Sequence, residues 1–273
     1  MSLVQIIVLA LIQGTTEFLP ISSSGHLILV PALTGWPDQG VVTDMVTNLG
    51  TLAAVIVYFW HDVLAMLRGL VDVARRETTR DSRLVLNVLI GTLPIIVVGL
   101  LLKVTHLDEH IRSTVLVAVN AIVFGALLYL ADAFGLSRRT VADMNWKTSL
   151  IIGCAQALSL SPGTSRSGIT MTAARGLGFV RPEAARFAFL LSIPANGAAS
   201  ALVIGNALES GEPISAAVIL TGVLTFFIAL ATITILMRLV RFMSFLPFAI
   251  YRIVLGVALL ALIYSGIPLG VVN

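Results

Sequence analysis

Two hydroxyl-rich stretches decide the fold of this chain: Glu17-Phe18-Leu19-Pro20-Ile21-Ser22-Ser23-Ser24-Gly25-His26 and Ser161-Pro162-Gly163-Thr164-Ser165-Arg166-Ser167-Gly168. Each stretch interrupts an apolar run that is too short to cross a bilayer. Carboxylates, histidines and arginines are costly in hydrocarbon, so ionisable side chains at membrane depth are candidates for a functional site. Two aqueous loops rich in turn residues are the alternative interpretation. Because two similar loops occur in corresponding places of the chain, the interpretation as a functional site is favoured.

The composition indicates a helical integral membrane protein. Of the 273 residues, 58% are hydrophobic and 11% are charged, whereas about 25% of a soluble domain is charged. The apolar runs are continuous rather than alternating, which predicts helices and not a β-barrel. The net charge of +3 does not indicate nucleic-acid binding, because the basic residues lie in short loops between apolar runs. Cys154 is the only cysteine, so no internal disulfide forms.

Six stretches are long enough to cross a membrane: 42–60, 84–104, 113–133, 185–205, 214–237 and 248–267. Two pairs of shorter runs flank the polar loops, namely 3–12 with 26–33 and 149–160 with 169–179. They predict re-entrant helix pairs, whose irregular backbone must be buried in protein or face water. We expect the run 3–12 to be retained rather than cleaved as a signal peptide, because no basic residue precedes it and a carboxylate and a proline follow it.

The predicted fold class is therefore an all-α polytopic membrane protein, a single integral membrane domain over 1–273. Each half contains one re-entrant pair followed by three spans. An odd number of spans per half predicts an inverted repeat, with 1–133 as the first copy and 149–267 as the second. The local sequence agrees, since Gln13 precedes the first loop as Gln156 precedes the second.

Positive charge predicts the orientation. Thirteen of the seventeen basic residues fall on one side of the six-span arrangement, which is then the cytoplasmic side: Arg68, Arg75, Arg76, Arg80, Arg83, Arg138, Arg139, Lys147, Arg175, Arg181, Arg186, Arg238 and Arg241. The exceptions are Lys103, Arg112, Arg166 and Arg252. Both termini then lie outside, and the two polar loops enter from opposite faces and meet near the midplane.

The first loop combines a carboxylate, three hydroxyls and an imidazole. Gln13 and Glu17 share one helical face and could bind a hard cation through carboxylate and amide oxygens. A carboxylate facing water at a helix end is the alternative for Glu17. The serines at 22–24 stand where a helix begins, so they could cap it or bind phosphate. Ser23 or Ser24 could act as a nucleophile, and His26 as a base, as a nucleophile or only as a structural residue.

Arg166 is the one charged residue of the second loop. Its planar fork suits phosphate oxygens, and the neighbouring Gly163 and Gly168 allow close backbone approach. The alternative is an arginine that only pairs with a buried carboxylate. Arg252, near the start of the last span, is a further cation that could bind a second phosphate or extend to the interface. The candidate substrate-binding set is Ser22, Ser24, Gly163, Thr164, Ser165, Ser167 and Arg252. No Walker loop, Rossmann fingerprint or zinc motif is present in the sequence.

Three segments of the two polar loops and the helix before the first loop resemble a known family. The segments 13–17 (Gln-Gly-Thr-Thr-Glu), 20–26 (Pro-Ile-Ser-Ser-Ser-Gly-His) and 162–170 (Pro-Gly-Thr-Ser-Arg-Ser-Gly-Ile-Thr) are similar to signature motifs of the bacitracin-resistance-type undecaprenyl-diphosphate phosphatases. The similarity continues in the segments 48–55, 188–194 and 244–252. The resemblance therefore covers nearly the whole chain. It implies a bacterial inner-membrane enzyme that hydrolyses undecaprenyl diphosphate to the monophosphate and phosphate. This reaction recycles the lipid carrier for peptidoglycan and other wall polymers.

The resemblance also implies roles for individual residues. It gives Glu17 a metal-binding or acid–base role, makes Ser23 a candidate nucleophile, His26 a catalytic residue and Arg166 a phosphate clamp, and it implies a divalent cation, Mg²⁺ or Ca²⁺. Relatives often carry Glu where this chain has Gln13, which removes one formal charge from the metal site. Whether Ser23 or His26 attacks phosphorus stays open.

We therefore expect a phosphatase whose active site opens to the outer face and whose partners are a polyprenyl diphosphate lipid and membrane lipids, without nucleic acid. A polyprenyl-phosphate transporter or flippase is the alternative, because inverted repeats with broken segments are typical of transporters. A nucleophile beside a base discriminates between them, since transport does not need one. The sequence does not fix the oligomeric state, and a homodimer is compatible with it.

Overall fold

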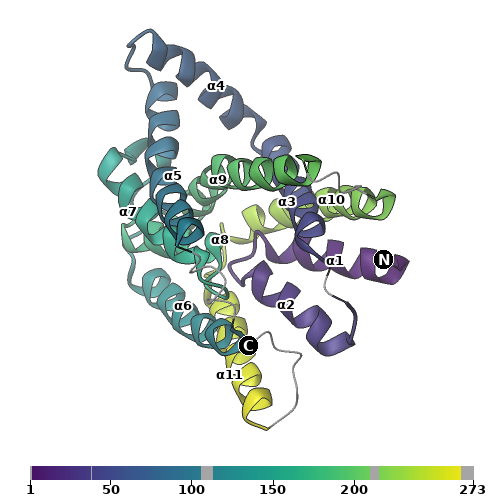
Figure 1. Cartoon of the computed structure of the whole chain (residues 1–273). Helices are drawn as coiled ribbons and strands as arrows, with labels where there is room; N and C mark the ends of the chain where they lie inside the picture. The colour runs from purple at the N-terminus through teal and green to yellow at the C-terminus, as the bar shows by residue number, and fades with distance from the viewer. Residues whose placement is uncertain (1, 38, 106–112, 210–214, 266–273) are drawn as a thin grey trace.

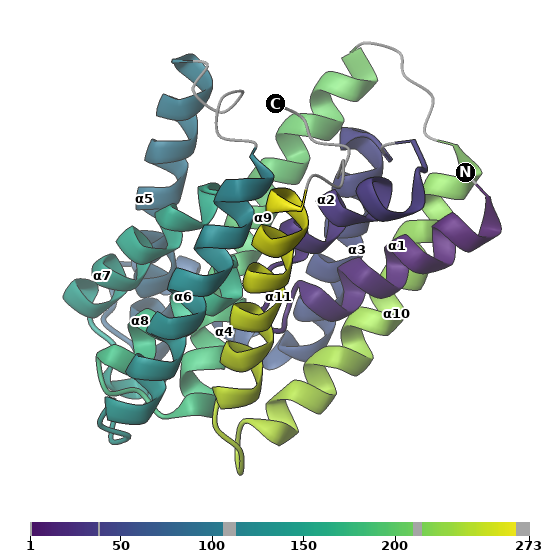
Figure 2. The same cartoon turned by 90° about the horizontal axis from the view of Figure 1, so that it is seen from below.

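The computed structural model describes residues 2–37, 39–105, 113–209 and 215–265. Within these ranges the chain is helical, and its only β-type pairing is one isolated bridge between Arg139 and Phe179. The helices pack into one bundle (Figures 1 and 2). In chain order they are α1 (Leu3–Thr16), α2 (Ser23–Thr34), α3 (Val41–Tyr58), α4 (Trp60–Ala74), α5 (Arg80–Val104), α6 (Thr114–Phe134), η2 (Val141–Asp143), α7 (Trp146–Ala157), η3 (Leu158–Leu160), α8 (Arg166–Gly176), α9 (Arg181–Glu209), α10 (Ala216–Leu239) and α11 (Leu246–Tyr264).

The six predicted spans are confirmed as helices of sufficient length and apolarity to cross a membrane. They are α3, α5, α6, α9, α10 and α11, and they begin and end within a few residues of the predicted bounds. Positions 214, 266 and 267 of the predicted spans lie outside the described residues. The chain is therefore a multi-pass membrane protein.

Four further helices, α1, α2, α7 and α8, are short. They contain 14, 12, 12 and 11 residues, and a helix needs about 20 residues to cross the hydrocarbon core. The two polar loops connect α1 to α2 and α7 to α8, as the sequence predicts. The packing of the short helices is paired: α1 packs along α10, and α7 packs along α5.

The prediction of a loop over 61–83 is wrong for most of this segment, because α4 extends to Ala74 and α5 begins at Arg80. Leu64, Leu67 and Val71 follow the three- and four-residue spacing of a helix, but the surrounding charges make the segment look like a loop. α4 packs along the first part of α5, and together they project from the bundle (Figure 1). An ion pair between Asp62 and Arg186 joins the start of α4 to α9.

A buried ion-pair cluster joins the basic segments at one end of the bundle. Asp132, at the end of α6, accepts hydrogen bonds of 2.8 Å from Arg175 and from Arg181 on the same oxygen. Its other oxygen accepts from the backbone N–H of Phe245 at 2.9 Å. The segments 134–148, 175–186 and 238–247 therefore lie on one side, in agreement with the charge pattern.

The core surrounds α9, which contacts the second polar loop through a hydrogen bond between Asn196 and Arg166. Phe187 and Phe189 of α9 are fully buried, and Phe189 meets the ring of Phe18 edge-on at 5.4 Å between centroids. α3 crosses α10 at Gly50, where a Cβ atom would lie 2.4 Å from the carbonyl oxygen of Gly222. This close crossing holds α3 beside the first loop.

Candidate active site

The two polar loops end in the same type of turn. Ser22 and Ser165 both have positive φ, 77° and 67°, a conformation that costs a non-glycine residue about 1–3 kcal/mol. Each caps the following helix, because Ser22 Oγ accepts from the N–H of Gly25 at 3.4 Å and Ser165 Oγ from that of Gly168 at 3.1 Å. Each cap is thus placed three residues before a glycine, and the two loops match in geometry as well as in sequence.

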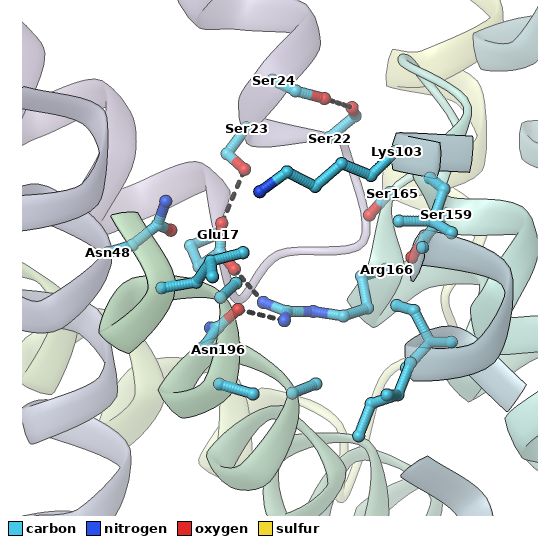
Figure 3. A pocket seen from close by; sticks show the side chains of 18 of the residues that line it. Glu17, Ser22, Ser23, Ser24, Asn48, Lys103, Ser159, Ser165, Arg166 and Asn196 are labelled. Carbon is cyan, nitrogen blue, oxygen red and sulfur yellow. Dashed lines mark hydrogen bonds and ion pairs between the residues drawn. The ribbon is translucent and has the colours of Figure 1, made fainter. Parts of the chain in front are cut away.

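Ser23 and Arg166 follow these caps and occupy equivalent positions, each as the first residue of its helix. Both side chains reach Glu17 (Figure 3). The Ser23 hydroxyl donates to Glu17 Oε2 at 2.6 Å, and Arg166 pairs with Glu17 Oε1. The side chains of Glu17 and Arg166 are 10% and 18% exposed. One carboxylate therefore joins the two loops.

Two amide side chains fix this arrangement. Arg166 also donates to Asn196 Oδ1 on α9, so both terminal nitrogens of its guanidinium are held. Gln13 donates from Nε2 to Glu17 Oε2 at 3.1 Å and to Asn48 Oδ1 at 2.9 Å. Gln13 Oε1 is buried and has no hydrogen-bond partner among the described residues.

These side chains open onto a pocket of about 580 Å³, a volume typical of small-ligand sites. Its polar side is lined by Glu17, Ser22, Ser23, Ser24, Asn48, Lys103, Ser159, Ser165, Arg166 and Asn196 (Figure 3). Its apolar side is formed by Ile95, Ile96, Gly99 and Leu100 of α5, Leu160, and Ala195, Ala198, Ala199 and Leu202 of α9. The pocket thus suits a molecule with an anionic head and an apolar tail.

His26 does not line this pocket. Its Nδ1 lies 2.7 Å from the carbonyl oxygen of Ser22, and its Nε2 lies 2.6 Å from the Tyr251 hydroxyl. Since a carbonyl only accepts, Nδ1 carries the hydrogen and Nε2 accepts from Tyr251 in the neutral ring. Both nitrogens are therefore engaged, and the imidazole ties α11 to the turn that carries Ser23.

Arg252 is fully buried and ties the two loops together from behind. It donates to the carbonyl oxygens of Gly163 at 3.0 Å, Thr164 at 2.7 Å and Pro20 at 3.3 Å. Because it is buried, it does not extend to the interface, and it does not line the pocket.

The remaining predicted residues divide into two groups. Ser22, Ser24 and Ser165 line the pocket. Gly163, Thr164 and Ser167 lie outside its lining, and Ser167 donates to the carbonyl oxygens of Glu17 and Leu19 at 3.1 and 3.2 Å. Gly163 has φ of 85°, and a Cβ atom there would lie 2.5 Å from the Val117 carbonyl oxygen, so only glycine fits.

The sequence interpretation missed four polar residues of the lining: Asn48, Lys103, Ser159 and Asn196. Asn48 and Asn196 each stand within an apolar span, which is itself a signal for a functional side chain. Lys103 is one of the four basic residues outside the predicted cytoplasmic segments, and only the fold shows that its side chain lines the pocket.

Comparison with known proteins shows the family of this chain. The family model described as "Bacitracin resistance protein BacA" matches residues 6–258. This chain belongs to that family. It is 43% identical to the undecaprenyl-diphosphatase of Erythrobacter litoralis, over 96% of this chain and 99% of the relative. It is 45% identical to that of Roseobacter denitrificans, over 97% and 100% of the two chains. It is 48% identical to undecaprenyl-diphosphatase 2 of Stutzerimonas stutzeri, over 98% and 100%.

The family resemblance implies a divalent cation, and few side chains of this pocket could bind one. No group of three His, Cys, Asp or Glu side chains gathers within the described ranges, and Glu17 is the one carboxylate among the described lining residues. Mg²⁺ is often held by one or two carboxylates together with substrate phosphates. Glu17 fits a cation that takes its other ligands from a diphosphate and water. Gln13 contacts Glu17 through Nε2, but it lies outside the pocket lining, and its buried Oε1 has no partner among the described residues.

Proposed function

We propose that this chain hydrolyses undecaprenyl diphosphate to undecaprenyl phosphate and inorganic phosphate, and so recycles the lipid carrier for cell-wall polymers. One observation carries the proposal: the Ser23 hydroxyl donates a hydrogen bond of 2.6 Å to Glu17, which also pairs with Arg166. These side chains line a pocket that has an apolar side. Relatives that share 43–48% of their residues with this chain are named undecaprenyl-diphosphatases. A hydroxyl held against a carboxylate is the arrangement that an activated nucleophile needs.

The first step is attack by Ser23 Oγ on the terminal phosphorus. Glu17 accepts the hydroxyl proton, the bond from the terminal phosphorus to the bridging oxygen breaks, and undecaprenyl phosphate leaves. Glu17 then releases this proton to water in the pocket and is again a carboxylate. A water molecule attacks the phosphoserine and gives a proton to Glu17, the bond from phosphorus to Ser23 Oγ breaks, Oγ regains its proton from Glu17, and phosphate leaves. Arg166 neutralises charge on the transferred phosphoryl group, which is the main electrostatic task in this chemistry.

Backbone N–H groups also support the binding of a diphosphate. α2 and α8 both begin at the pocket, and their caps Ser22 and Ser165 are part of its lining. The first N–H groups of a helix have no intrahelical acceptor and favour phosphate. Two helix N-termini therefore support binding of a diphosphate between them.

A divalent cation, Mg²⁺ or Ca²⁺, is part of the proposal. When bound, it would neutralise phosphoryl oxygens, and Glu17 with Gln13 would hold it from the protein side. We assign Ser23 rather than His26 as the nucleophile because both imidazole nitrogens are engaged outside the pocket lining.

We further propose that α1–α2 and α7–α8 are re-entrant pairs of an inverted repeat in the bacterial inner membrane, with the pocket open to the outer face. The matched turns at Ser22 and Ser165, and the matched packing of α1 on α10 and α7 on α5, support the repeat. The basic end around Asp132 supports the orientation.

Phosphate release by the purified chain tests the function. Detergent-solubilised protein with undecaprenyl diphosphate should release one phosphate per lipid, with undecaprenyl phosphate identified by mass spectrometry. Ser23→Ala should release none above background. Lipid translocation in vesicles without phosphate release would instead support the transporter alternative.

A further inference from the structure

Lys103 is a cation of the pocket to which no role has been assigned. It stands in the last turn of α5, and Figure 3 shows its side chain extended across the pocket toward Ser23 and Glu17. Within the described ranges its ammonium group makes no hydrogen bond or ion pair. An ammonium group has three donors, and no described residue accepts from any of them.

The charge balance of the pocket points to an anion at Lys103. Three ionisable side chains occur among the described lining residues: Glu17, Arg166 and Lys103. Glu17 and Arg166 form an ion pair and neutralise each other. Lys103 leaves one uncompensated positive charge, which a bound anion would neutralise.

The position of Lys103 on α5 indicates which part of the substrate it meets. Ile96, Gly99 and Leu100 precede it at helical spacing and form the apolar side of the pocket. A prenyl diphosphate carries its tail, its inner phosphate and its terminal phosphate in that order. With the terminal phosphate at Ser23 and Arg166 and the tail along α5 and α9, the inner phosphate lies between them, where the apolar face of α5 ends at Lys103.

We infer that Lys103 forms a second phosphate subsite, which binds the inner phosphate that stays on the lipid. The inference rests on the proposed hydrolysis and adds to it. When Ser23 Oγ bonds to the terminal phosphorus, the bond from that phosphorus to the bridging oxygen breaks, and its electron pair stays on the lipid monophosphate. The positive charge of Lys103 stabilises this charge on the leaving group. Arg252 does not supply this charge, because it is buried behind the loops.

Product inhibition separates the two subsites. Farnesyl phosphate carries the inner phosphate, whereas inorganic phosphate takes the place of the terminal one. For Lys103→Met we expect kcat/KM for farnesyl diphosphate to fall and the Ki of farnesyl phosphate to rise, each about 10- to 100-fold, as for the loss of a hydrogen bond to a charged group. The Ki of inorganic phosphate should change less than about twofold. Lys103→Arg keeps the charge and should retain most of the wild-type affinity for farnesyl phosphate.

Lys147→Met is the matched control, because Lys147 is an exposed lysine on α7 that lies 5.6 Å from the Trp146 ring and outside the pocket lining. Direct binding of farnesyl phosphate, measured by calorimetry on wild type and variants of equal thermal stability, gives a readout that does not need turnover. An equal rise in both Ki values for Lys103→Met would overturn the assignment to the inner phosphate. Unchanged farnesyl phosphate binding would overturn the subsite itself. A wild-type protein that releases no phosphate would instead refute the proposed function, whatever the binding results.

Discussion

Ser23 and Glu17, six residues apart on either side of a turn, are joined by a hydrogen bond of 2.6 Å. The same carboxylate pairs with Arg166, which comes from the other half of the chain. Glu17 thus orients a hydroxyl with one oxygen and a guanidinium with the other. The turn that places Ser23 is matched by the turn that places Arg166. The proposed nucleophile and the proposed phosphate-binding cation are therefore each the first residue of the helix that follows its turn.

Ser23→Ala is the first prediction. Removing the attacking oxygen removes a chemical step, so we expect kcat to fall by at least about 1000-fold. Ser24→Ala is the matched control, because Ser24 lines the same pocket but lies 3.3 Å from Ser22 instead of bonding to Glu17. It should retain at least about a tenth of wild-type kcat. A phosphate trapped by acid quench and located by mass spectrometry should lie on Ser23, and its absence from Ser23 would count against this nucleophile.

Arg166→Lys tests the planar fork. The guanidinium reaches Glu17 and Asn196 with two different nitrogens, whereas an ammonium is a point charge and loses this geometry. We expect kcat/KM to fall by about 100-fold. Arg68→Lys should leave kcat/KM unchanged, since the Arg68 side chain is 70% exposed and 3.8 Å from its partner Asp81. Equal activity of Arg166→Lys and wild type would mean that charge alone suffices.

His26 and Tyr251 should behave as a coupled pair. If the imidazole positions the turn of Ser23 through its bonds to Ser22 and Tyr251, then His26→Ala and Tyr251→Phe should each lower kcat by about tenfold. The double variant should then be no worse than His26→Ala alone, as for residues that act together. A loss in His26→Ala as complete as in Ser23→Ala, with Tyr251→Phe unaffected, would instead support a catalytic His26.

The helices that cross the membrane could be predicted from sequence because each needs only a long apolar run. α4 could not, since Asp62, Arg68 and Asp72 lie among its apolar residues, and charged residues are also typical of a loop between spans. Hydropathy averages over both faces of a helix, and only the tertiary packing on α5 shows which face is used.

The site was predictable in its chemistry but not in its contacts. Glu17, Ser23 and Arg166 stand out as polar residues in apolar surroundings, and they meet in the pocket. Arg252 is also a charged residue in apolar surroundings, yet it binds backbone carbonyl oxygens instead of lining the pocket. Lys103 does not stand out in this way, because it lies at the end of a helix. Which cation faces a cavity depends on helix rotation and crossing, and a single sequence does not specify these.

The proposed requirement for a divalent cation leads to two expected results. Excess EDTA should abolish phosphate release, and Mg²⁺ or Ca²⁺ should restore it. Gln13→Glu adds a carboxylate beside Glu17, so the concentration of cation needed for half-maximal activity should fall, because ligand charge raises affinity for hard cations. Full activity in EDTA would remove the cation from the mechanism, and an unchanged requirement in Gln13→Glu would exclude position 13 from the site.

Arg252→Met should destabilise the site without touching the pocket. Its loss leaves the carbonyl oxygens of Pro20, Gly163 and Thr164 without this donor in a buried place, and each unsatisfied buried group costs about 1–3 kcal/mol. We therefore expect a lower thermal unfolding midpoint together with lower kcat, because both loops lose a common anchor. Arg241→Met, on the exposed basic end, is the matched control and should change neither quantity. If Arg252→Met kept the wild-type unfolding midpoint and only raised KM, the guanidinium would bind substrate rather than hold the loops.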